Sequence, residues 1–193
     1  RVALTRLVEQ KLLERKTGVG TRVCQGRPAE SGIGAWRSFS REMAEKGIQV
    51  ANFRQKYERV AADAVAVRAL QIKPGAKLWR LDRVRGWGGR PVLHTRSWFH
   101  PRLGLTGRED FSKPLYEVIE SETGAVVTNA REEFTAVSAS AAMARLLAVK
   151  PGEPLLLRSH TVFDAGERPV EFAVVNYVSS RFALTLELKR ETP

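Results

Sequence analysis

The sequence has very little cysteine and no long apolar run. Cys24 is the only cysteine among 193 residues, so an intrachain disulfide is excluded. No segment approaches the about 20 consecutive apolar residues that cross a bilayer, and no basic-then-apolar export signal opens the chain. These absences exclude a disulfide-rich secreted domain, and they predict a cytoplasmic protein without a membrane partner.

Motifs for catalysis and metal binding are also lacking. The three histidines, His94, His100 and His160, are too scattered to suggest a metal site, and no serine occupies a nucleophile elbow. Glu132 and Glu133 are neighbours on an expected strand, where side chains alternate between faces, so their spacing does not make an acid/base pair. We therefore expect no catalytic residue, metal or cofactor.

Positive charge is in excess and unevenly placed. The formal net charge is +11, and residues 1–60 hold 13 basic against 6 acidic residues, whereas the remaining 133 hold 19 against 15. A basic N-terminal end is typical of a segment that meets a polyanion such as nucleic acid. The plainer alternative is a generally basic protein whose charges are only solvated.

The N-terminal end has the pattern of a helix followed by a basic hairpin. Apolar residues recur at helical spacing over residues 1–10, and two short runs, 12–16 and 21–24, flank the turn Thr17-Gly18-Val19-Gly20. A helix leading into a basic hairpin is the second half of a winged helix-turn-helix. Lys16 and Arg22 on the hairpin could contact DNA phosphates.

The phrase RVALTRLVEQKLLERKTGVGT resembles the end of the DNA-binding domain of the GntR family of bacterial transcription regulators. The resemblance covers residues 1–24 and implies that Arg1 is a DNA-contacting recognition-helix arginine. It also places Thr17, Gly18 and Gly20 at the wing tip, whereas Lys11 stands where the family usually has glycine. The first two helices of the motif are missing, so we expect a part of a longer protein that binds operator DNA poorly by itself.

Glycine, proline and serine crowd residues 26–34, which predicts a linker over 26–35. Ser40 is then a candidate N-cap for a short helix that ends at Gly47. This helix would pack Trp36, Phe39 and Met43 on a core; alternatively, N–H groups near Ser38 and Ser40 could also receive an anion.

A repeat organises the rest of the chain. RALQIKPGAKLWR at 68–80 is echoed by RLLAVKPGEPLLL at 145–157, at a constant offset of 77, and eight of sixteen residues are identical between 60–75 and 137–152. Each copy predicts an Ala-rich helix, a Lys-Pro-Gly turn and a hairpin, with turns at Gly88-Gly89 and Asp164-Ala165-Gly166. Two such units predict an α+β fold, one antiparallel sheet with helices on one face, and a ligand cavity between the halves.

Several phrases in order, among them FSREMAEKG, LDRVR, LYEVIE and ERPVEFAVVNYVSSRF, resemble the UTRA effector-binding domain. This is the C-terminal module of HutC-like GntR regulators and is similar in fold to chorismate lyase. The resemblance spans roughly residues 36–186, and it implies that 36–193 binds a small effector and forms a homodimer.

Basic side chains share the expected cavity face. Strand alternation puts Arg83 and Arg85 in line with an apolar stripe, and puts Arg158 and His160 on the corresponding face of the second unit. Buried arginines favour an anionic partner, which their planar forks bind bidentately. The alternative is that internal carboxylates such as Glu133, Glu171 or Asp82 neutralise them.

The resemblance implies roles for individual residues. In relatives that bind sugar phosphates, arginines at the places of Arg83 and Arg85 contact the phosphate, while Glu171, Tyr177 and Tyr116 match polar ligand contacts. Thr95 is also predicted to contact the ligand, although the relatives often have an acidic residue there. Pro114 replaces a frequent serine, so an amino-sugar phosphate fits imperfectly. We predict an anionic effector such as a sugar phosphate, phosphonate or organic acid.

The leading hypothesis is therefore a ligand-responsive DNA-binding regulator, most often a repressor in this family, acting as a homodimer. One alternative is an enzyme of the chorismate lyase type acting on a small aromatic acid, which would leave residues 1–24 unexplained. Another is a dimerisation module without an effector, whose arginines would all be neutralised internally.

Overall fold

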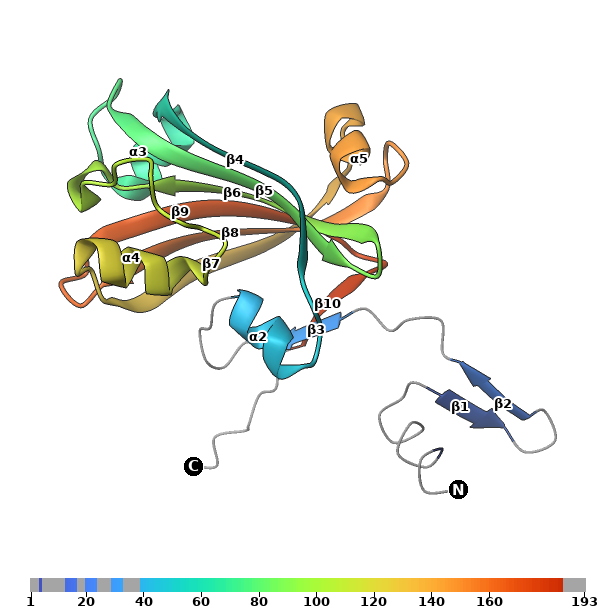
Figure 1. Ribbon diagram of the computed structural model, residues 1–193. Coiled ribbons are helices and arrows are strands. Elements are labelled where there is room, and N and C mark those ends of the chain that lie inside the picture. The colour runs from blue at the N-terminus through green and yellow to red at the C-terminus, as the bar shows by residue number, and fades with distance from the viewer. Residues whose placement is uncertain (1–3, 5–12, 17–19, 24–28, 33–38, 186–193) are drawn as a thin grey trace, which may run out of the picture. The chain divides into compact units, whose positions relative to one another are not determined.

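The computed structural model describes residue 4 and residues 13–16, 20–23, 29–32 and 39–185, in two compact units (Figure 1). The first unit comprises residues 1–33 and 179–193, and the second comprises residues 34–178. The predicted limits of wing, linker and effector domain stay a prediction.

The second unit is built on a six-stranded antiparallel sheet (Figure 1). The strands lie in the spatial order β4-β5-β6-β9-β8-β7. Their bounds are β4 Ala51–Ala61, β5 Lys77–Trp87, β6 Arg90–Phe99, β7 Val127–Ser138, β8 Pro154–Asp164 and β9 Pro169–Val178. The hairpins β5–β6 and β8–β9 stand side by side at the centre, because β6 pairs with β9.

The predicted repeat is confirmed and is larger than its sequence identity suggests. Helix α3 (Ala64–Leu70) and helix α5 (Ala141–Leu147) are 77 residues apart at both ends, as are β5 and β8. Each unit also opens with an edge strand, β4 or β7, which the sequence analysis did not assign to the repeat, although it expected a strand at Glu132 and Glu133. The repeated unit is thus strand, helix, turn and hairpin.

Equivalent residues end the two repeat helices in the same way. The side chains of Asp63 and Ser140 cap the helix N-termini by accepting hydrogen bonds from the backbone N–H groups of the third residues on. The C-caps Gln71 and Ala148 both adopt left-handed backbone conformations, with φ of 55° and 50°. Since only glycine adopts this conformation without strain, both positions stop the helix at some energetic cost.

The two repeat helices pack on one face of the sheet, which we call the back face. Helix α3 covers Leu78, Trp98 and Phe172, and α5 covers Leu155 and Val178. The predicted α+β class, with the repeat helices on one face, is confirmed. Their apolar stripes provide the burial that drives this packing, since propensity alone does not hold a seven-residue helix.

The opposite, front face carries two helices that lie outside the repeats. Helix α4 (Leu115–Thr123) packs against Leu81 and Val170, while the loop before it contributes Phe111, whose ring stacks on Phe99 with centroids 5.5 Å apart. Helix α2 (Phe39–Glu45) begins before Ser40, so the prediction that Ser40 is the N-cap is wrong. The serine lies inside the first turn, where its hydroxyl is available to other partners.

The first unit contains the predicted hairpin. Strand β1 (Leu13–Lys16) pairs with β2 (Gly20–Val23) in antiparallel fashion, as the Gly-x-Gly turn suggested. Strand β3 (Ala29–Gly32) lies inside the segment predicted as a linker and pairs in parallel with β10 (Phe182–Thr185). Of the predicted helix over 1–10 only Leu4 is described, and it is helical. Arg1, Thr17, Gly18 and Ser38 lie outside the described residues.

Substitutions at the two ends of α5 should change the stability of the protein in opposite directions. Ser140→Ala removes the N-cap hydrogen bond and should lower the free energy of unfolding by about 1 kcal/mol. Ala148→Gly should raise it by about 0.5 to 1 kcal/mol, because relief of the left-handed strain exceeds the entropy cost of glycine. Urea unfolding of both variants checks this. A destabilised Ala148→Gly variant would contradict the strain argument.

Candidate ligand-binding site

The front face brings polar residues from both halves into adjacent rows across the four central strands. One row runs Arg83, Thr95, Val175 and Arg158, each directly opposite the next on neighbouring strands. The next row contains Ser97 and His160. The pairing of β6 with β9 therefore puts Arg83 and Arg158, which are 75 positions apart in sequence, at the two ends of one row on the same surface.

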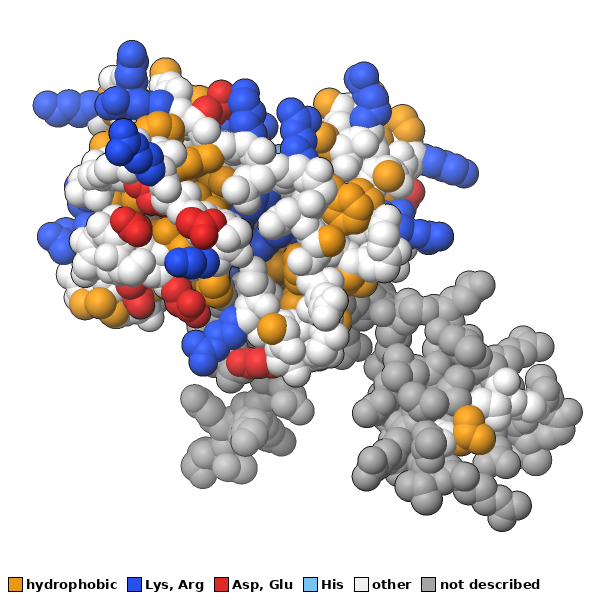
Figure 2. Space-filling view, in the orientation of Figure 1, with side chains coloured by type: hydrophobic (Ala, Val, Ile, Leu, Met, Phe, Trp, Pro, Cys, Tyr) orange, Lys and Arg blue, Asp and Glu red, His pale blue; other side chains and the backbone are white. Residues whose placement is uncertain are grey.

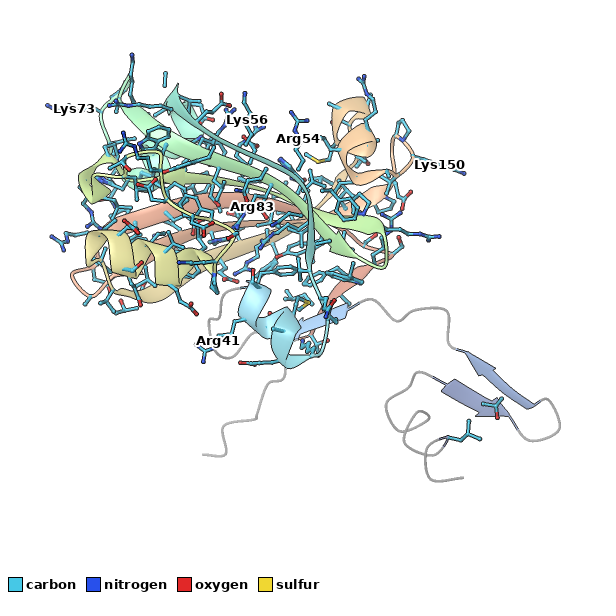
Figure 3. All side chains as sticks on the ribbon, viewed as in Figure 1. Arg41, Arg54, Lys56, Lys73, Arg83 and Lys150 are labelled. Carbon is cyan, nitrogen blue, oxygen red and sulfur yellow. The ribbon has the colours of Figure 1, made fainter. Side chains whose placement is uncertain are left out.

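Two connected hollows lie over these rows. The inner one has a volume of about 50 Å³, is bounded by α2 and α4, and is lined by Phe39, Ser40, Arg83, Arg85, Thr95, Ser97, Leu115, Tyr116, Arg158, His160, Glu171, Val175 and Tyr177. The outer one has a volume of about 510 Å³ and shares Ser40, Arg83 and Arg85 with it. Its remaining wall comes from α2, residues 47–52 and the loop before α4. Figure 3 shows Arg83 projecting from the sheet into the space between these elements.

Arg83 and Arg85 are the most unusual residues of the site. They are 4% and 6% exposed, and neither forms an ion pair with a carboxylate of the described residues. Arg83 donates to the Phe111 carbonyl at 3.5 Å; Arg85 donates to the Ser40 hydroxyl at 3.2 Å and lies 4.8 Å from the Phe39 ring centroid. Burial lowers the pKa of both guanidinium groups, and for Arg85 the adjacent Arg83 lowers it further.

Arg158 is neutralised by a carboxylate. Its guanidinium donates to Glu132, which lies on the edge strand β7, and it contacts the Tyr177 hydroxyl at 3.5 Å. Burial alone would lower the pKa of Arg158, but Tyr177 and Glu132 raise it more. Glu133, which the alternative of internal neutralisation named as one example, is not the partner. The register of β7 on β8 puts Glu132 on the face of this row and Glu133 on the other face.

Glu171 is the buried acid of the site, with 1% of its surface exposed. It accepts a hydrogen bond from the Tyr116 hydroxyl at 2.7 Å, and the His160 ring lies 3.8 Å away. Burial raises the pKa of Glu171, but its contacts with His160, Ser97 and Tyr116 lower it more, so the group is an anion at neutral pH. Burial beside this carboxylate raises the pKa of Tyr116, which stays a donor.

Several buried polar atoms around the inner hollow have no hydrogen-bond partner among the described residues. They include Nε of Arg83, Arg85 and Arg158, the Thr95 hydroxyl and Nδ1 of His160. A buried polar group without a partner costs free energy. A bound molecule that accepts hydrogen bonds could therefore receive them from several of these groups.

One alternative supposed that Asp82 neutralises the cavity arginines, and the structure contradicts it. Strand alternation puts the Asp82 carboxylate on the back face, where it binds Arg80, Arg96 and His94 at 2.8, 2.7 and 3.3 Å. Burial raises the pKa of Asp82, but these partners outweigh burial and lower it from 3.8 to about 2.

The structure thus gathers eight of the nine predicted ligand residues around one hollow: Arg83, Arg85, Thr95, Tyr116, Arg158, His160, Glu171 and Tyr177. Their binding role stays a prediction. Sequence reasoning missed Phe39, Ser97 and Glu132 as members of the site. The alternation pattern could have suggested Ser97, two residues from Thr95, whereas Phe39 reaches the site only through the placement of α2.

Of the predicted DNA-contacting residues, Lys16, Gly20 and Arg22 lie on the β1–β2 hairpin. Gly20 has a φ of 105°, a conformation that favours glycine. No group of three or more metal-ligating side chains occurs in the described part of the chain, and none of its helices is long and apolar enough to span a membrane.

Comparison with known proteins identifies the domain. The model of the UTRA domain matches residues 48–183, which is most of the chain. The chain belongs to the UTRA domain family. That match includes the whole six-stranded sheet, from Ala51 to Val178.

The relatives of this UTRA protein are transcription regulators. It is 25% identical to the mannosyl-D-glycerate transport/metabolism system repressor MngR of Escherichia coli K12, over all of this chain and 80% of MngR. It is 24% identical to the HTH-type transcriptional repressor NagR of Bacillus subtilis 168, over 98% of this chain and 78% of NagR. The predicted kinship with GntR-family regulators carrying a UTRA domain is thereby confirmed.

The fold agrees with solved structures as well. PhnF from Mycobacterium smegmatis superposes with a TM-score of 0.82 over 99% of this chain and 84% of PhnF, at 22% identity. At this level of identity the likeness establishes the fold alone.

The depressed pKa of Asp82 predicts an acid-sensitive stability. A group with a folded-state pKa of about 2 and an ordinary value of 3.8 contributes stability above pH 4, and this contribution is lost as the pH falls from about 4 to 2. Asp82→Asn should therefore be less stable at neutral pH and show a flatter loss of unfolding free energy below pH 4. Urea unfolding at several pH values measures this, with the exposed Glu120→Gln as the control. Parallel curves for wild type and Asp82→Asn would contradict the assignment.

Proposed function

We propose that the protein is a ligand-responsive transcription repressor of the HutC-like GntR branch, in which the UTRA domain binds a small anionic metabolite and the binding alters operator affinity. The observation that carries the proposal is the pair Arg83 and Arg85. Both are buried, they lie on one face two residues apart, and no described carboxylate forms an ion pair with either. Burying two cations in this way is costly unless an anion joins them.

The chemistry of the hollow suggests how the ligand binds. An acidic group would accept hydrogen bonds from the arginine forks and from Thr95, while the rest of the molecule occupies the outer hollow of about 510 Å³. Glu171, held as an anion, would receive a hydroxyl or amine of the ligand. Sugar phosphates, phosphonates and organic acids meet these requirements.

Helix α2 is the element that would transmit binding. Its Phe39 and Ser40 contact Arg85 directly, and α2 follows the segment that leads from the predicted DNA-binding region. A ligand that competes for Arg85 would change the preferred position of α2. Only a ligand that binds two such states differently can shift their populations, and in a homodimer this would change the spacing of the DNA-binding heads on a palindromic operator.

The alternative function is an enzyme of the chorismate lyase type. The relatives are repressors, and the matched segment 1–24 is expected in a DNA-binding protein and not in such an enzyme. Absence of turnover of a small aromatic acid, together with effector-dependent DNA binding, would decide between them. A plain dimerisation module is disfavoured because neither Arg83 nor Arg85 forms an ion pair with a described carboxylate, although Glu171 in the same hollow partly compensates their charge.

The pocket assignment is tested by the Arg83→Ala, Arg85→Ala double variant. A thermal-shift screen of sugar phosphates, phosphonates and organic acids first identifies an effector, which at about 100 Kd should stabilise the protein by roughly 2.7 kcal/mol. The double variant should then lose at least about 100-fold in affinity, since each charge-assisted hydrogen bond contributes about 1.5 to 3 kcal/mol. Calorimetry measures the loss.

The matched control is Arg59→Ala, Arg90→Ala, which removes the same charge from exposed strand ends. Arg83→Lys keeps the charge but loses the planar fork of the guanidinium. It tests the assignment even if the double variant does not fold, and it should weaken binding by an intermediate amount. Wild-type affinity in the double variant would refute the assignment.

DNA binding by the full-length regulator should fall steeply with salt. Neutralising several phosphates gives a slope of log K on log salt of about −0.9 per phosphate. Fluorescence anisotropy with DNA from upstream of its own gene, between about 50 and 200 mM salt, measures this slope with and without effector. Binding that ignores salt, or that ignores every effector that binds the UTRA domain, would contradict the proposed function.

A further inference from the structure

A second cavity lies on the back face, behind the ligand hollow and under α5. It has a volume of about 140 Å³, which corresponds to several water molecules at about 30 Å³ each. Strands β4, β5 and β6 form its floor, and Leu146 of α5 forms part of its wall. Its polar lining consists of Arg54, Lys56, Arg80, Asp82, His94 and Arg96. Arg83 also lines it, although the Arg83 guanidinium donates to the Phe111 carbonyl on the front face.

A β-bulge aims the edge strand at this cavity. Asn52 pairs with Arg85, a front-face residue, whereas Arg54 pairs with Val84, a back-face residue, because the register shifts at Phe53. Without the bulge, residues 52 and 54 would face the same side. The bulge thus sends Asn52 to the outer front hollow and Arg54 to the back cavity. Figure 3 shows Arg54 and Lys56 projecting from β4 on the side of the sheet that carries α5.

Positive charge exceeds negative charge around the cavity. Asp82 is shared by Arg80 and Arg96, and Glu58 is shared by Arg80 and Lys56. Four cations therefore face two carboxylates, since Arg54 adds a positive charge and forms no ion pair with a described residue. Figure 2 shows basic side chains grouped along this upper side of the domain.

The cavity also contains a buried polar group whose hydrogen bonding is incomplete. His94 is 5% exposed, and its Nε2 lies 3.3 Å from the Asp82 carboxylate. Its Nδ1 has no hydrogen-bond partner among the described residues. A ligand in the cavity could supply one.

We propose that this back cavity is a second anion-binding site, specific for a phosphate-sized oxyanion and distinct from the front hollow. Arg54 and Lys56 would bind the oxyanion from the edge strand, where Lys56 can leave its half-exposed pairing with Glu58 at little cost. Arg80, Arg96 and His94 form the floor, already oriented by Asp82. The unfilled charge of +2 matches a doubly charged phosphate.

The two sites share strands and can therefore influence each other. Asp82 alternates with Arg83 on β5, and His94 alternates with Thr95 on β6. An oxyanion on one side changes the electrostatic field at the arginines on the other, and two anions on opposite faces of one sheet repel. Phosphate in the back cavity should therefore weaken, and not strengthen, binding of an anion in the front hollow.

The test uses the whole chain and inorganic phosphate as the probe, with NMR of the histidine ring resonances as the readout. Chloride at matched ionic strength serves as the reference. His94 should show a saturable shift with phosphate and none with chloride. The Arg54→Gln, Lys56→Gln variant should raise the apparent Kd at His94 at least tenfold. The Lys73→Gln, Lys150→Gln variant removes the same charge at the two exposed Lys-Pro-Gly turns and should leave it unchanged.

Front-site binding is separated by Arg85→Ala, because Arg85 lines the front hollow and not the back cavity. This variant should leave the His94 titration within twofold of wild type and alter only His160. Three results would overturn the proposal. The first is equal titrations in wild type and the Arg54→Gln, Lys56→Gln variant. The second is a shift that follows ionic strength with either salt, and the third is loss of the His94 shift in Arg85→Ala. The proposal does not depend on DNA binding or on the identity of the effector.

Discussion

The pairing of β6 with β9 is the contact on which the rest of the architecture depends. It joins the two repeat units into one sheet, and neither half alone would present a complete binding face. Through this one ladder, Arg83 of the first unit and Arg158 of the second come into the same row. A single isolated hairpin is marginally stable, whereas six strands with helices on both faces bury enough apolar surface to fold stably.

The asymmetry between the repeats separates scaffold from function. Equivalent positions form the caps, turns and helix contacts, because both copies must solve the same packing problem. At the cavity the copies differ: Arg83 and Arg85 correspond to His160 and Val162 at the offset of 77. Only one half supplies the two unneutralised arginines, which gives a nearly symmetric fold an asymmetric site.

Strand alternation lets each central strand serve both faces. On β5, Arg83 and Arg85 face the front hollow, while Asp82 organises the cations of the back. The Asp82 carboxylate is thus directed away from the front arginines. The front face keeps an excess of positive charge because Arg83, Arg85 and Arg158 share it with only two carboxylates, Glu132 and Glu171.

The sequence by itself determined the repeat, the α+β class, the turns and the family, since these follow from local periodicity, glycine placement and ordered motifs. It also indicated which face Arg83 and Arg85 share, because alternation along a strand is a local property. Only the tertiary structure decided that Glu132 pairs with Arg158, that Phe39 and Ser40 reach Arg85, and that a bulge turns Arg54 to the back face. These depend on the register of edge strands and on the docking of α2, which are set by contacts between residues far apart in the chain and leave no periodic trace in the sequence.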